Sequence, residues 1–111
     1  MPNLMPSDIV VEVEAVMRSA NQGKGNSPRF LTAYQILHRL PEATKSRIIA
    51  ERTIGGAGAG VHYGAPSVVS DAAEMVPHVQ ISYLDCQDLS ISVAGTPITP
   101  GYPVCGLYRI E

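Results

Sequence analysis

A histidine and a tyrosine, His62 and Tyr63, follow a run of glycines at residues 55–60 and precede a segment that favours a helix. A histidine placed there can act as a general base, with the tyrosine as a hydrogen-bond donor. The residues that follow offer hydroxyl nucleophiles and carboxylates to complete such a site: Ser67, Ser70, Asp71 and Glu74. No spacing rule selects one combination, and no Gly-x-Ser-x-Gly elbow is present. A small enzyme using His62 and Tyr63 is therefore one alternative.

The glycine run itself allows close backbone approach to a ligand, or a tight or flexible turn. It lacks the lysine of a Walker loop. A dinucleotide fingerprint that starts at Gly56 fails because Val61 stands where the last glycine belongs. Free amide groups ahead of a helix can still attract an anion. The predicted ligand-binding residues are accordingly Gly58, Gly60, His62, Tyr63 and Ser67.

Neither a metal site nor a cofactor is predicted, because the three histidines lack the close spacing of zinc ligands. The N-terminus does not look like a signal peptide, and no apolar run is long enough to cross a bilayer. We therefore expect a cytoplasmic protein without membrane contact. In that compartment Cys86 and Cys105 favour two reduced thiols over a disulfide, although the sequence leaves their pairing open.

The elements that must position these residues come from the hydrophobic period. With 111 residues, 45% of them hydrophobic and 16% charged, the chain predicts one globular domain, residues 1–111. Helical spacing covers about 7–20, 28–40, 42–52 and 66–76, with Ser7 and Ser27 as the first caps. Alternation then predicts strands at 79–84, 89–93 and 104–110. The predicted fold is α+β, with about four N-terminal helices packed on one face of a C-terminal three-stranded antiparallel sheet.

Strand parity divides the apolar residues between the two faces of that sheet. The predicted core face holds Val79, Ile81, Tyr83, Leu89, Ile91, Val93, Val104 and Tyr108. The opposite face then holds Leu84, Cys86, Cys105 and Leu107, which is apolar for an exposed surface. A homodimer through this sheet face is predicted, with cover by the N-terminal segment as the alternative.

Charge is distributed unevenly, although the net charge is only −2. Seven of the eight basic residues lie between Arg18 and Arg52, and the predicted basic surface is Arg39, Lys45, Arg47 and Arg52. Such a surface can attract an anionic partner, or can simply be a solvated helix face. The element order also suggests a winged-helix nucleic-acid-binding regulator. Its recognition helix would span 66–76, however, where Asp71 and Glu74 would repel phosphate and no basic residue occurs.

The stretches at 30–37 and 63–74 resemble small uncharacterised bacterial proteins carried on mobile elements, including integron gene cassettes. The resemblance implies an accessory or interaction role and transfers no functional residue. The leading hypothesis is therefore a non-enzymatic binding or regulatory protein, acting on a protein or small anionic ligand through the glycine-loop surface at 55–63. Nucleic acid is the less favoured partner.

Overall fold

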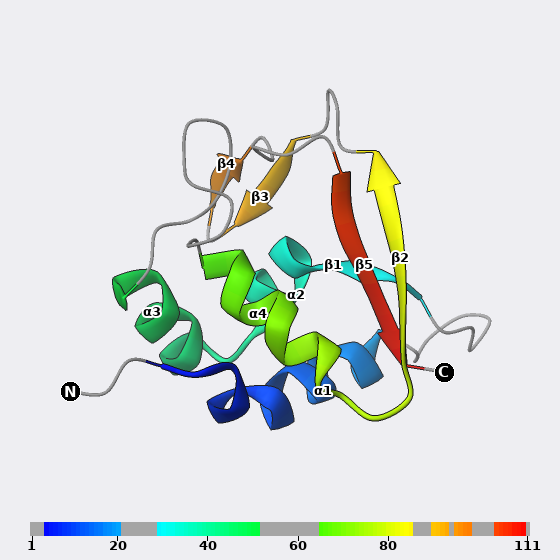
Figure 1. The fold of residues 1–111 in the computed structure, drawn as a ribbon. Coiled ribbons are helices and arrows are strands. Elements are labelled where there is room, and N and C mark those ends of the chain that lie inside the picture. Colours follow the sequence, from blue (N-terminus) through cyan, green and yellow to red (C-terminus); the bar gives the residue numbers. More distant parts are fainter. Residues whose placement is uncertain are drawn as a thin grey trace.

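The computed structural model describes residues 4–20, 29–51, 65–85, 90–93, 95–98 and 104–110. Its elements are, in order, the 3-10 helix η1 (Pro6–Asp8), α1 (Val10–Ser19), β1 (Leu31–Thr32), α2 (Ala33–Arg39), α3 (Glu42–Glu51), α4 (Ala65–Glu74), β2 (Val79–Asp85), β3 (Ile91–Val93), β4 (Thr96–Ile98) and β5 (Val104–Ile110). Four α-helices and a three-stranded antiparallel sheet confirm the predicted α+β class (Figure 1).

The last strand, β5, lies in the middle of the main sheet, whose order is β1-β5-β2. Both neighbours are antiparallel to it, and Tyr108 stands opposite Leu31 of β1 and Ile81 of β2. The prediction that the strand at 89–93 joins this sheet is wrong. Instead β3 pairs with β4 in a separate hairpin, where Gly95 adopts a φ of 83° that suits a tight turn.

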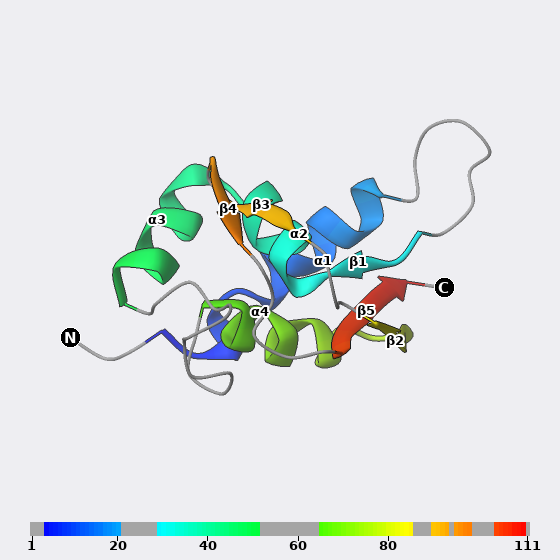
Figure 2. The ribbon, with the colours of Figure 1, turned by 90° about the horizontal axis from the view of Figure 1, so that it is seen from above.

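The core lies between the sheet and three helices, α1, α2 and α4 (Figure 2). The apolar stripes predicted for the helices are confirmed, and the largest fully buried side chains are Ile9, Val13, Met17, Ile36, Leu37, Ile48 and Val69. Helix α3 contributes Ile48 to this core, whereas its apolar residue Ala43 is exposed. The described helices therefore pack on one face of the sheet.

Two helix starts differ from the prediction. Helix α2 begins at Ala33, because Thr32 and Gln35 form a capping box: Gln35 N donates to Thr32 Oγ1 (3.2 Å) and Thr32 N donates to Gln35 Oε1 (2.9 Å). Near the N-terminus Ser7 caps nothing, since it lies inside η1 and α1 starts at Val10. The predicted start at Ser27 lies outside the described residues.

The predicted core face of β2 is only partly buried. Val79 packs against the core, but Ile81 is 44% exposed and Tyr83 is 73% exposed. Both share a face with buried Tyr108, so the predicted parity is correct and the predicted burial is wrong. The reason is that β2 is the edge strand of the described sheet, and the helices cover β5 more completely than they cover β2.

Candidate functional site

Most of the predicted ligand-binding surface lies outside the described residues. This holds for Gly58, Gly60, His62 and Tyr63, and for Arg52 of the basic surface. Ser67 is described and is half-buried in the first turn of α4. The hypothesis of an enzyme using His62 and Tyr63 therefore stays a prediction.

Ser70, one of the predicted nucleophiles, instead links α4 to the sheet. Its hydroxyl is hydrogen-bonded to the hydroxyl of Tyr108 in β5. Burial raises the pKa of Tyr108 above its ordinary value, and the bond from Ser70 opposes that rise only in part. Asp71 and Glu74 are exposed on the same helix. This arrangement indicates a structural role for Ser70.

The described part of the predicted basic surface is partly neutralised. Lys45 Nζ lies 3.3 Å from Glu42 Oε2 and also donates to His38 O at 3.0 Å. Arg47 Nε lies 3.8 Å from Glu51 Oε1. Arg39 is exposed and lines the groove described below. Pairs of this kind between neighbouring turns weaken the attraction for an anionic partner.

The predicted interface residues lie on one face of the sheet, as parity required. Leu84 stands opposite Cys105, and Leu107 follows on the same side of β5. Cys105 is buried and disulfide-bonded, so the prediction of reduced thiols is wrong. Cys86 lies outside the described residues. Because Cys105 is covered, the apolar surface on this face is smaller than the sequence indicated.

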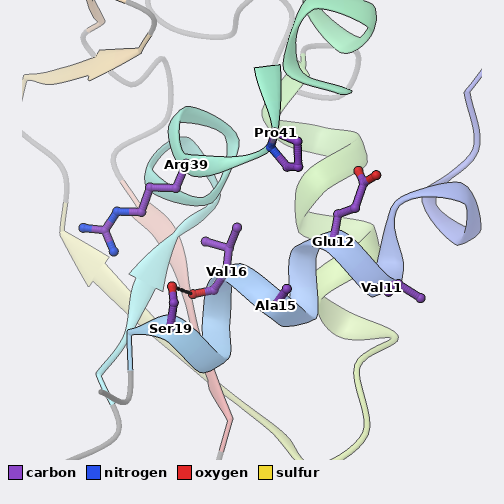
Figure 3. A pocket seen from close by; sticks show the side chains of 7 residues that line it. All are labelled: Val11, Glu12, Ala15, Val16, Ser19, Arg39 and Pro41. Carbon is purple, nitrogen blue, oxygen red and sulfur yellow. Dashed lines mark hydrogen bonds between the residues drawn. The ribbon is translucent and has the colours of Figure 1, made fainter. Parts of the chain in front are cut away.

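A groove that the sequence did not predict runs between α1 and the α2–α3 turn (Figure 3). It has a volume of about 380 Å³ and is mainly apolar. We call it the α1 groove; its lining residues are Val11, Glu12, Ala15, Val16, Ser19, Arg39 and Pro41. Arg39 extends away from Glu12 in the close view, so the two charges lie toward different parts of the groove (Figure 3). Apolar lining with few polar groups is typical of binding sites.

Glu12 is the unusual residue of this groove. Its Oε2 atom is shielded from solvent and has no hydrogen-bond partner. Glu12 also lines a second hollow, of about 260 Å³, which contains Arg47 and Thr44. A shielded carboxylate oxygen without a donor is costly, and it calls for a specific explanation such as a bound ligand.

The spacing of Glu12 within α1 carries a signal for its position. A glutamate in an amphipathic helix usually points away from the core. Glu12 follows Ile9 by three residues and precedes Val16 by four, a spacing that places it beside the apolar stripe of α1. Glu14 is half-buried and does have a partner, since it accepts a hydrogen bond from Arg18 Nε (2.9 Å).

No protein-family description, curated protein or solved structure matches this chain. In the described parts of the chain, no three His, Cys, Asp or Glu side chains lie close enough together to hold a metal ion. None of the described helices has both the length and the apolar character required to span a membrane.

Proposed function

We propose that this chain is a non-enzymatic binding protein, and that its α1 groove takes an apolar segment of a partner protein bearing one ammonium or guanidinium group. The observation that carries the proposal is the shielded, unpartnered Oε2 of Glu12 at the edge of an apolar groove. A cationic donor there would satisfy this oxygen, while Ala15, Val16 and Pro41 would contact the apolar part.

The expected energetics favour a cation over a neutral donor. A hydrogen bond to a charged group contributes about 1.5–3 kcal/mol, roughly twice a neutral one. Arg47 lies in the neighbouring hollow but is paired with Glu51, so it does not satisfy Glu12. Glu12 therefore has the chemistry of a recognition group rather than that of an internal ion pair.

Octylammonium is a suitable probe, because it combines one ammonium group with an apolar chain. We expect it to shift the backbone amide signals of α1 and the α2–α3 turn in two-dimensional NMR titrations of the full chain. Glu12→Gln keeps the size of the side chain and removes the charge. It should weaken binding at least about tenfold, which corresponds to the loss of about 1.4 kcal/mol.

Glu14→Gln is the matched control, since it removes the same charge two residues away, at a half-buried side chain that does not line the α1 groove. It should leave binding unchanged, and octanoate should bind more weakly than octylammonium. Equal affinity of the wild type and Glu12→Gln for octylammonium would remove Glu12 from the site. Absence of any shift in the α1 groove at millimolar probe would refute the proposed function.

Strand topology favours a second candidate, the winged-helix nucleic-acid-binding regulator. Strand β1 lies between the first two helices, and β5 lies between β1 and β2, which agrees with winged-helix order. The charges oppose it, since α4 carries exposed Asp71 and Glu74 and no basic residue. We expect no change in the fluorescence anisotropy of labelled duplex DNA even at low salt. Salt-sensitive binding would favour this candidate over a protein partner.

Three expectations from the sequence stay predictions. These are the anionic ligand at the glycine-loop surface, the cytoplasmic location, and the resemblance to proteins of mobile elements. The disulfide at Cys105 argues against the cytoplasmic location, because stable disulfides are rare in that compartment.

A further inference from the structure

Strand β2 carries exposed apolar side chains beside its outer edge: Ile81, Tyr83 and Leu84. Among the described residues, no strand pairs with this edge, and β2 lies beside β5 alone (Figure 1). Residues 79–84 carry no charged side chain and no proline. Soluble proteins usually protect an edge strand with charged residues or proline, because the unpaired backbone groups of the edge can pair with another strand.

The backbone of β2 presents a defined set of hydrogen-bonding groups to this edge. Val79 N donates to Val76 O (3.3 Å) in the turn that leads from α4 into β2, and not to a carbonyl of β5. Backbone groups of an antiparallel strand alternate in direction, so those of Ile81 and Tyr83 point the same way as the amide of Val79. Ile81 and Tyr83 therefore offer their amides and carbonyls to a strand added at the edge.

We propose that a second copy of this chain occupies the edge, so that β2 pairs antiparallel with β2 of its partner about a twofold axis at Ser82. In this register Ile81 stands opposite the partner's Tyr83, and the twofold axis produces the contact twice. Both side chains are exposed in the single chain, so the contact buries an aromatic and a β-branched residue against each other.

Charge favours the antiparallel arrangement over a parallel one. Asp85 is the one charged residue in β2, and it ends the strand. Antiparallel pairing about Ser82 places Asp85 opposite the partner's Val79, whereas parallel pairing in register would place two Asp85 carboxylates side by side. The two β1-β5-β2 sheets would then form one continuous six-stranded sheet. This dimer uses the edge of the sheet instead of the predicted face, and it does not involve the α1 groove.

The paired edge is short, so we expect a dissociation constant in the micromolar range. Sedimentation equilibrium of the full chain from about 5 to 500 µM should show a monomer–dimer transition. Tyr83→Lys should raise the dissociation constant at least tenfold. It removes the apolar contact with the partner's Ile81 and adds one positive charge to each of the two paired strands. Met5→Lys, on a side chain near the N-terminus that is 57% exposed and does not line the α1 groove, is the matched control and should leave the constant unchanged.

Cross-linking tests the register directly. Ser82→Cys brings two thiols together at the twofold axis, and the Cα separation of opposing residues there, about 4.5–5.5 Å, suits a disulfide. Gln80→Cys lies on the same face but stands opposite the partner's Leu84, so it should not cross-link. A covalent dimer from Ser82→Cys alone would support the proposal. A chain that stays monomeric at 500 µM, or equal cross-linking of both variants, would overturn it.

Discussion

Ile36→Ala is expected to lower the free energy of unfolding by about 3–4 kcal/mol. Ile36 is fully buried in α2, the helix that packs against α1, α4 and the strands β1, β3 and β5. Truncation removes three carbon atoms from a site enclosed on several sides, so the surrounding elements can collapse into the cavity only in part. A loss of this size is a large share of the 5–15 kcal/mol that stabilises a typical domain.

Urea unfolding followed by circular dichroism measures this effect, and the midpoint should fall while the slope stays constant. Thermal unfolding should shift downward by roughly 15–25 °C in a domain of this size. Val11→Ala, on the exposed side of α1, should change stability by less than about 0.5 kcal/mol. A loss below about 1 kcal/mol for Ile36→Ala would mean that α2 is not the centre of the core.

The helices could be predicted from the sequence because their apolar residues recur over several turns. Val13 and Met17 in α1 are buried together with Ile9 just before it, and so are Val69 and Ala73 in α4. The apolar stripe of a helix can be recognised from the sequence alone, because it recurs with the helical period whatever the helix packs against. For the same reason α3 was recognised from its sequence, although Ile48 is its one buried residue.

Strand partners could not be predicted in the same way. Alternation in β2 identified which residues share a face, but that pattern is the same for a central and an edge strand. The exposure of Ile81 and Tyr83 depends on where the helices end, which is a tertiary property. Strand β1 has only two residues, too few for any period, and Thr32 serves both as its end and as the cap of α2.

The candidate site could not be predicted, because a charged residue in a helix is usually exposed and spacing alone does not identify Glu12 as an exception. A glutamate on a helix usually points to solvent, and Glu42 and Glu51 of α3 are exposed in this way. Glu12 lies nearer to the apolar stripe of α1 than Glu14 does. The α2–α3 turn with Pro41, which is distant in the sequence, lines the same groove as Glu12. No local pattern predicts that arrangement. The groove is therefore visible only once the helices are packed.

Gly106→Ala is expected to lower the free energy of unfolding by about 2–4 kcal/mol, a larger effect than a one-methyl change usually has. Gly106 lies in β5 two residues before Tyr108, on the same face of the sheet, and the tyrosine ring leans back over it. A Cβ atom at Gly106 would lie 2.9 Å from Cζ of Tyr108, well inside normal contact. The ring would have to move, and its hydrogen bond to Ser70 of α4 would break.

A double-mutant cycle separates this steric effect from a general weakening of β5. Tyr108→Phe removes the bond to Ser70 and should cost about 1 kcal/mol or somewhat more in the wild-type background. In the Gly106→Ala background that bond is already lost, so the same change should cost much less. Leu107→Ala, on the opposite face of β5, is the control and should combine additively with Tyr108→Phe. Equal costs of Tyr108→Phe in both backgrounds would show that Gly106 is not needed to place the Tyr108 ring under α4, and the contact between β5 and α4 would then need another explanation.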